Sequence, residues 1–261
     1  MRKERVGFAM CGSFCTHEKV LAELEKLVQL YETVIPIASE ISAFTDTRFG
    51  TSDDLMERLE DLTGHEVLCD IPSVEPIGPK GLLDVLVIAP ATGNTIAKLA
   101  AGITDTAVTM AAKAHLRNGR PILLAPSTND GLAGSAPSLG ALLNRRYIYF
   151  VPFGQDDPER KPTSLVSDFS QVADAAQAAL EGRPVPPLPP LARRCETAVR
   201  QFRLSAAQKG EHIACLEARK HYAWYLKGVP YAGYYKEQIS KISTLEDIDR
   251  ITAGIQRDLR D

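Results

Sequence analysis

The sequence predicts an α/β protein, a doubly wound parallel sheet that is followed by a small all-α helical bundle. Short apolar runs alternate with amphipathic segments from residue 5 to about residue 182, which is typical of parallel strands joined by helices. A proline-rich stretch then precedes a region with helical periodicity alone. We therefore expect one domain at 1–182, a linker at 183–190 and a helical domain at 191–261.

The composition is that of a folded protein, with 44% apolar and 24% charged residues among 261. The net charge of −3 conceals an asymmetry, because residues 1–189 carry −7 and residues 190–261 carry +4. Five scattered cysteines without a Cys-x-x-Cys pair predict reduced thiols and no metal site. The lack of a signal peptide or a membrane-length apolar run leads us to expect a cytoplasmic protein without membrane contact.

The first strand–turn–helix unit is predicted at 5–10, 11–16 and 17–30. Gly12 lets the backbone approach a ligand, and the Ser13 hydroxyl can bind phosphate or cap the helix. An ordinary capped turn is the alternative. The next strand, 34–38, ends at Ser39, which is either a phosphate contact or a solvated loop serine.

The middle of the chain predicts a helix at 53–62, a weak edge strand at 67–71 and a proline-rich loop at 72–81. The apolar run at 82–89 then predicts a strand that is buried on both faces and ends at Pro90.

A small, polar turn follows this strand and leads into a helix at 96–101, with Asn94 or Thr95 as its N-cap. Backbone N–H groups at such a helix start favour an anion, and phosphate is the natural ligand. Parallel strands bring such turns to one edge of the sheet, where ligands bind. The alternative is a plain crossover connection that binds nothing.

The remaining elements follow the same alternation. We predict helices at 105–117, 135–144 and 168–180, strands at 121–125 and 147–151, and a polar loop at 152–166. Beyond the linker, helices are predicted at 193–209, 213–227, 231–241 and 245–259.

The run Ala89-Pro90-Ala91-Thr92-Gly93-Asn94-Thr95 resembles a motif of the flavoprotein superfamily of flavin-dependent cysteine decarboxylases, whose fold is flavodoxin-like or Rossmann-like. With Lys98, Thr104-Asp105 and the segment 152–166, it resembles the B subunits of dipicolinate synthase more closely than the superfamily in general. The resemblance implies FMN as the cofactor. It places FMN at Gly12, Ser13, Ser39, Thr92, Gly93, Asn94, Thr95, Ser127 and Asn129.

The same resemblance implies an oxidoreductase subunit that acts with an A subunit, which would bring NADP, to oxidise dihydrodipicolinate to dipicolinate in sporulation. We also expect a homo-oligomer. No pair of residues forms a convincing acid–base couple, so no catalytic residue is assigned. A stand-alone FMN-dependent decarboxylase is the alternative, and two residues oppose it. His65 lies at a helix end without a decarboxylase motif, and Thr128 replaces that family's methionine.

The C-terminal region interleaves basic and aromatic residues, a composition that suits RNA contact. Arg219-Lys220-His221, Trp224-Tyr225 and Lys227-Gly228 resemble the C-terminal helical domain of bacterial tRNA-dihydrouridine synthases. The resemblance implies tRNA contact through Arg219, Lys220, His221 and Lys227, which would make the chain a tRNA-binding module fused to a flavoprotein-like domain. The alternative is a helix pair whose aromatic rings only pack together.

Overall fold

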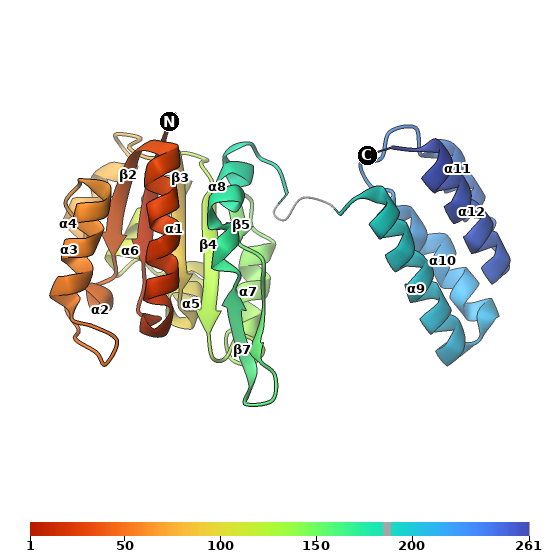
Figure 1. Ribbon diagram of the computed structural model, residues 1–261, viewed down its shortest axis with the longest axis horizontal. Coiled ribbons are helices and arrows are strands. Elements are labelled where there is room, and N and C mark those ends of the chain that lie inside the picture. Colours follow the sequence, from red (N-terminus) through yellow and green to blue (C-terminus); the bar gives the residue numbers. More distant parts are fainter. Residues whose placement is uncertain (185–188, 261) are drawn as a thin grey trace. The chain divides into compact units, whose positions relative to one another are not determined.

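The computed structural model describes residues 1–184 and 189–260, and the chain divides into two compact units between residues 187 and 188 (Figure 1). Part of the predicted linker, residues 185–188, lies outside the described residues. The N-terminal unit contains a seven-stranded sheet flanked by helices, and the C-terminal unit contains helices. The predicted fold class is therefore confirmed.

The sheet has the strand order β2-β1-β3-β4-β7-β6, and β5 pairs with the first half of β4. Strands β2, β1, β3, β4 and β5 are parallel, as predicted. The strands are β1 (Arg2–Met10), β2 (Tyr31–Ala38), β3 (Val85–Ala91), β4 (Ile122–Thr128), β5 (Ile148–Phe150), β6 (Phe153–Asp157) and β7 (Lys161–Ser167).

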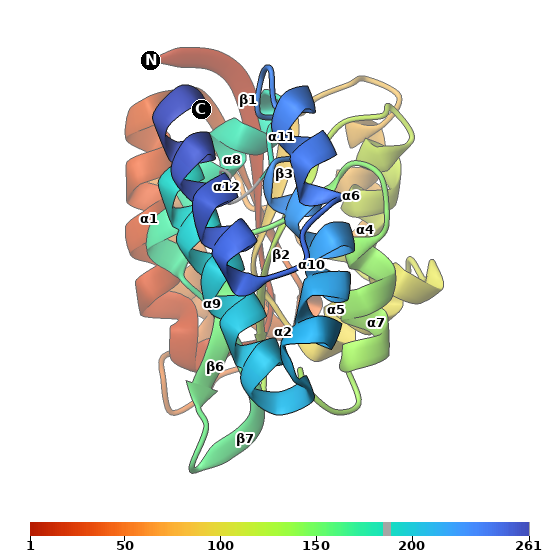
Figure 2. The ribbon, with the colours of Figure 1, turned by 90° about the vertical axis from the view of Figure 1, so that its right-hand side faces the viewer.

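The loop expected at 152–166 is an antiparallel hairpin, which makes the sheet mixed. Its strands β6 and β7 pair from Phe153 opposite Ser167 to Asp157 opposite Lys161. Strand β7 also pairs with the end of β4, where Ser127 lies opposite Val166. Because the residues of this segment are polar, the sequence did not predict the ladder of hydrogen bonds that satisfies the backbone groups of both strands. The hairpin projects at the edge where β4 ends (Figure 2).

Helices cover both faces of the sheet. Residues of α1, α3 and α8 share one buried cluster with Phe8 and Val87, whereas residues of α5, α6 and α7 share the other with Leu86 and Ile88. The helical segments are η1 (Phe14–Thr16), α1 (His17–Leu30), α2 (Glu40–Ala43), α3 (Ser52–Thr63), α4 (Ile71–Val74), η2 (Glu75–Ile77), α5 (Gly93–Ala101), α6 (Ala107–Leu116), α7 (Ala136–Leu143), η3 (Phe169–Gln171) and α8 (Val172–Leu180).

Strand β3 is buried along its whole length, as predicted, but its bounds differ from 82–89. It begins at Val85, because Asp84 instead accepts hydrogen bonds from the backbone and side chain of Arg5. It continues past Pro90 to Ala91, which pairs with Pro126. Pro90 falls within an irregularity of the ladder, so its missing N–H group breaks no bond there.

The segment before β3 is more helical than predicted. The expected strand at 67–71 is reduced to a single bridge between Leu68 and Ile37. The expected loop at 72–81 contains α4 and η2. Asp70 and Ser73 form a capping box that starts α4, and Pro72 lies in its first turn, where no N–H is needed.

The C-terminal unit consists of α9 (Leu191–Lys209), α10 (Glu211–Tyr225), α11 (Gly233–Ile239) and α12 (Leu245–Asp258), close to the four predicted helices. Helix α9 packs against both α10 and α12 (Figure 2). The Phe202 and Tyr222 rings meet in its core with centroids 5.5 Å apart. No helix in the described part of either unit is long and apolar enough to cross a bilayer.

Candidate functional site

Three polar turns meet at the carboxyl edge of the parallel strands. The first follows β1 and holds Gly12 and Ser13, the second follows β3 at Thr92, and the third begins at Ser127 and Thr128, the last two residues of β4. Ser13 Oγ lies 2.8 Å from Ser127 Oγ, so a hydroxyl hydrogen bond joins the first and third turns. The parallel topology therefore brings residues 114 positions apart into one site.

A cavity of about 940 Å³ opens at this edge. Of the residues that the sequence assigned to FMN, the cavity is lined by Gly12, Ser13, Thr92, Gly93, Ser127 and Asn129. The volume lies at the upper end of the range that is usual for cofactor sites. Ser39, Asn94 and Thr95 are not among the lining residues.

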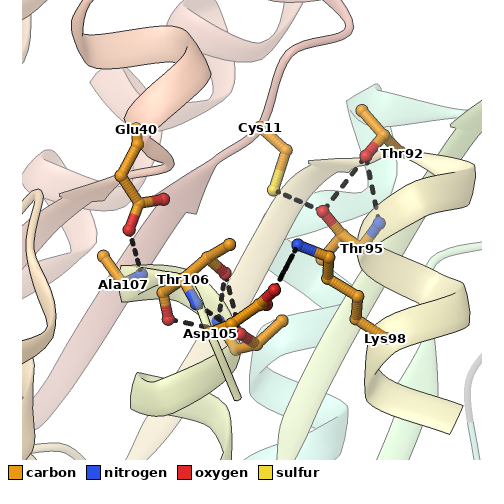
Figure 3. A network of polar contacts seen from close by, with 9 residues as sticks. Cys11, Glu40, Thr92, Thr95, Lys98, Asp105, Thr106 and Ala107 are labelled. Atoms are coloured by element: carbon orange, nitrogen blue, oxygen red, sulfur yellow. Dashed lines mark hydrogen bonds and ion pairs between the residues drawn. The ribbon is translucent and has the colours of Figure 1, made fainter. Parts of the chain in front are cut away.

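The second turn is capped by Thr92, not by Asn94 or Thr95 as predicted. The Thr92 hydroxyl accepts a hydrogen bond from the Thr95 backbone N–H at 3.3 Å, and α5 therefore begins at Gly93 (Figure 3). The N–H groups of Gly93 and Asn94 belong to the first turn of α5, where intrahelical acceptors are missing. They can therefore bind an anion in the cavity.

Thr95 points back toward the first turn. Its hydroxyl donates a hydrogen bond to Cys11 Sγ at 3.3 Å, and this bond connects the polar turn after β1 to the N-terminal part of α5 (Figure 3). Burial raises the pKa of the Cys11 thiol to about 11. Cys11 is therefore a neutral, structural thiol at pH 7.

Ser39 is buried and starts the short helix α2, where its hydroxyl lies 3.0 Å from that of Ser42. The adjacent Glu40 accepts a hydrogen bond at 2.9 Å from the backbone N–H of Ala107, the first residue of α6 (Figure 3). Lys98 forms an ion pair with Asp105 at 2.9 Å. These contacts fix the loops around the second turn and neutralise the Lys98 charge.

Gly93 lies against a cluster of three polar side chains. A Cβ atom at this position would stand 2.6 Å from both Thr128 Oγ1 and Ser135 Oγ, and 3.0 Å from Asp130 Oδ1. Both hydroxyls donate to Asp130 and hold the pKa of its carboxyl below the usual range. Only glycine fits here, so the start of α5 and the loop after β4 come into direct contact.

Several cavity residues were not predicted from the sequence. They come from the body of α1, the loop after α2 and the β6–β7 hairpin: Lys19, Glu23, Arg48, Phe49, Asp156 and Lys161. Glu23 alone left a signal, because an acidic residue stands beside the apolar positions Leu24 and Leu27 of α1. Lys19 lies in the same predicted helix, Asp156 and Lys161 lie in the predicted polar loop at 152–166, and Arg48 and Phe49 lie outside any predicted strand or helix.

No histidine is found among the described residues that line the cavity. His65 is exposed in the turn after α3. His17 lies beneath the first turn, with Nε2 2.9 Å from the Cys11 carbonyl oxygen, and burial lowers its pKa. In residues 1–184 and 189–260, no group of His, Cys, Asp and Glu side chains is arranged to hold a metal ion.

In the C-terminal unit, the predicted RNA-contact residues differ in their surroundings. Lys220 and Lys227 are exposed, and neither forms an ion pair with a described residue. Arg219 donates to the Ile242 carbonyl at 2.7 Å. The His221 ring stacks on the exposed ring of Trp224 with centroids 4.7 Å apart.

The fold and the cavity define a doubly wound α/β protein whose polar turns line a cavity at the carboxyl edge of the parallel strands. The chain belongs to the Flavoprotein family, whose model matches residues 1–133. The dipicolinate synthase B subunit of Bacillus subtilis (strain 168) is 42% identical over 188 residues, which are 72% of this chain and 94% of that protein.

Solved structures agree with this assignment. The crystal structure of the dipicolinate synthase B subunit from Bacillus halodurans C is 40% identical, with a TM-score of 0.65, and the match covers 71% of this chain and 95% of that one. An FMN-dependent cysteine decarboxylase from thioviridamide biosynthesis shares the fold, at 21% identity, with a TM-score of 0.50 and coverage of 68% and 98%.

The C-terminal part has a separate relative. A probable tRNA-dihydrouridine synthase of Mycobacterium leprae (strain TN) is 36% identical over 72 residues, which are 28% of this chain. The matched stretch is 19% of that protein. The two resemblances noted in the sequence are thus confirmed.

Proposed function

We propose that the N-terminal unit binds FMN at the carboxyl edge of its sheet. The observation that carries the proposal is the meeting of three polar turns at one cavity, joined by the Ser13–Ser127 hydrogen bond. The phosphate would lie against Gly12, Ser13 and the first-turn N–H groups of α5. Membership of the Flavoprotein family supports this assignment.

The residues present fit the cofactor. Gly93 keeps the backbone accessible at the start of α5, where a side chain would strike its neighbours. Thr92, Ser127 and Asn129 add polar groups along the cavity wall. Ser39, Asn94 and Thr95 would act through the shape of the turns and through backbone N–H groups. When bound, FMN would supply a two-electron acceptor.

We further propose that the chain is the B subunit of a dipicolinate synthase. In this role it acts with an A subunit, which carries NADP, to oxidise dihydrodipicolinate to dipicolinate in sporulation. The 42% identity to a relative of this kind over 72% of the chain supports it. Assembly with copies of itself and a cytoplasmic location stay predictions.

Two measurements on the full chain test this function. Heat-denatured protein should release FMN, and FMN at 100 times its Kd should raise the unfolding free energy by about 2.7 kcal/mol. Adding the chain to an A subunit with NADP and dihydrodipicolinate should increase dipicolinate formation. A protein that neither carries nor binds FMN contradicts the cofactor assignment. An A subunit that works equally well alone contradicts the subunit assignment.

A stand-alone FMN-dependent decarboxylase is the weaker alternative. The cavity is lined by Thr128 where the decarboxylase motif has methionine, and His65 does not line it. Decarboxylation of a cysteine-terminated peptide by the chain alone, without an A subunit, would favour this alternative.

The C-terminal unit is the basis of a second proposal, in which residues 191–261 form a separate helical domain that binds tRNA weakly. The proposed domain follows the flavoprotein-like domain at 1–182 and the linker at 183–190. Exposed Lys220 and Lys227 without ion-pair partners among the described residues, and the exposed Trp224 ring beside His221, support RNA contact. The 36% identity to a tRNA-dihydrouridine synthase supports it further.

Binding of tRNA should fall steeply with salt. Three phosphate contacts give a log–log slope of roughly −2 to −3, and Lys220→Ala should reduce it by about one contact. Lys241→Ala is the matched control, because Lys241 is also exposed but is paired with Glu237 at 2.9 Å. Filter binding of mixed tRNA between low and moderate salt measures both slopes. Absence of binding at low salt, or a slope near zero, would show that the unit does not bind RNA through these cations.

A further inference from the structure

One carboxylate oxygen of the N-terminal unit is buried without a partner. Glu23 lies on α1 and is 5% exposed. Its Oε1 atom forms an ion pair with Lys26 Nζ at 2.7 Å, whereas its Oε2 atom has no hydrogen-bond partner among the described residues. A buried carboxylate oxygen that accepts no hydrogen bond is costly, because it loses water and gains nothing in return.

Two neighbouring lysines could have lowered the free-energy cost of this buried oxygen, but neither forms a hydrogen bond with it. Lys19 stands one helical turn before Glu23, the spacing at which side chains on a helix meet, yet the two form no ion pair. Lys26 satisfies only one of the two carboxylate oxygens. The second oxygen is therefore left for a donor that the described residues do not provide.

Glu23 differs in position from the other buried group of this kind in residues 1–184, which the structure describes. His115 Nδ1 also lacks a partner, but His115 is not among the residues that line the cavity. Glu23 does line it, together with Lys19 and Ala22 of α1. The residue that carries the unsatisfied oxygen thus belongs to the wall of the site that the three polar turns form.

The wall beside α1 indicates what kind of group reaches Glu23. It includes Phe169, which is buried, and Ser170, which is exposed. An apolar ring together with a hydroxyl and a carboxylate suits a ligand portion that has both a ring and hydrogen-bond donors. The turns that we propose to hold the phosphate contribute other residues to the lining of the same cavity.

We propose that Glu23 is a flavin-binding residue, whose Oε2 atom accepts a hydrogen bond from a hydroxyl or ring N–H group of bound FMN. The inference rests on the proposed FMN site and adds to it a contact outside the polar turns. It explains why a carboxylate is retained on the buried side of α1, where the neighbouring positions Val20, Leu24 and Leu27 are apolar and fully buried.

Titration of the apo full-length chain with FMN, followed by quenching of flavin fluorescence, tests the contact. Glu23→Ala should raise the Kd for FMN on the order of tenfold or more, because a hydrogen bond to a charged group is lost. Glu23→Gln keeps the shape and an acceptor oxygen, and should lose less. Lys26→Ala is the matched control, since it removes the same ion pair but leaves Oε2 in place.

Titration with riboflavin separates the Glu23 contact from the contacts to the phosphate. Riboflavin lacks the phosphate but keeps the hydroxyls and the ring, so Glu23→Ala should weaken riboflavin binding by the same factor as FMN binding. Equal FMN affinity for wild type, Glu23→Ala and Glu23→Gln would overturn the contact and leave the FMN site standing. If Lys26→Ala weakens FMN binding as much as Glu23→Ala does, Glu23 acts only through its ion pair with Lys26, and the proposed contact is overturned. A wild-type chain that binds no FMN would overturn the site and the contact together.

Discussion

Replacing Gly93 by alanine should weaken FMN binding at least tenfold and lower the unfolding free energy by about 2 kcal/mol. The added methyl group would stand 2.6 Å from the hydroxyl oxygens of Thr128 and Ser135, inside their contact distance. Either these side chains release Asp130 or the start of α5 shifts, and both changes move the proposed phosphate site. Thermal unfolding and FMN titration of the full chain measure the two effects.

Gly140→Ala is the matched control, because a Cβ at Gly140 in α7 meets no atom within 4 Å. A helical glycine replaced by alanine should gain about 0.5–1 kcal/mol, and FMN binding should not change. Trp224 is the single tryptophan of the chain and lies in the C-terminal unit. Its fluorescence therefore reports on the folding of that unit. Wild-type FMN affinity in Gly93→Ala would show that the start of α5 takes no part in the site.

Much of the fold was predictable because local patterns and topology agree. Helix α1 begins at His17 and ends at Leu30 as its apolar spacing predicted, since the same residues face one cluster of the core. The hairpin β6–β7 was not predictable in this way. Its residues Gln155, Asp156 and Asp157 are polar, and only pairing with β7 makes them strand residues.

The residues of the candidate site also divide into those that the sequence could place and those that it could not. Gly12, Ser13 and Thr92 follow directly after buried strands, so their position in the chain was enough to place them at one edge. Arg48 and Lys161 come from a loop and a hairpin that only the tertiary fold brings to the cavity. The cap of α5 was misplaced by two or three residues, because Thr92, Asn94 and Thr95 are all good capping residues and the geometry of the turn decides among them.

Acidification from pH 7 to pH 4 should destabilise the N-terminal unit by about 2–3 kcal/mol through one histidine. His115 is fully buried on α6, with Nε2 3.0 Å from the Pro121 carbonyl oxygen. Burial lowers the pKa of its imidazole to about 4, against about 6.5 in the unfolded chain. The unfolded state therefore binds the proton first as the pH falls, and stability decreases between these two values.

Amide hydrogen exchange of β3 and β4, corrected for the pH dependence of intrinsic exchange, measures this loss within the full chain. His115→Gln keeps a donor for the Pro121 carbonyl and should remove most of the pH dependence between pH 6.5 and 4. The remainder should come from His17, whose pKa burial also lowers, and, toward pH 4, from carboxyls such as Asp130, whose pKa is lowered by the hydroxyls that donate to it. His65→Gln is the control, because His65 is exposed and its loss should leave the profile unchanged. If the stability stays constant across this range, burial does not keep His115 neutral. Protonation of its imidazole between α6 and β4 would then cost no free energy.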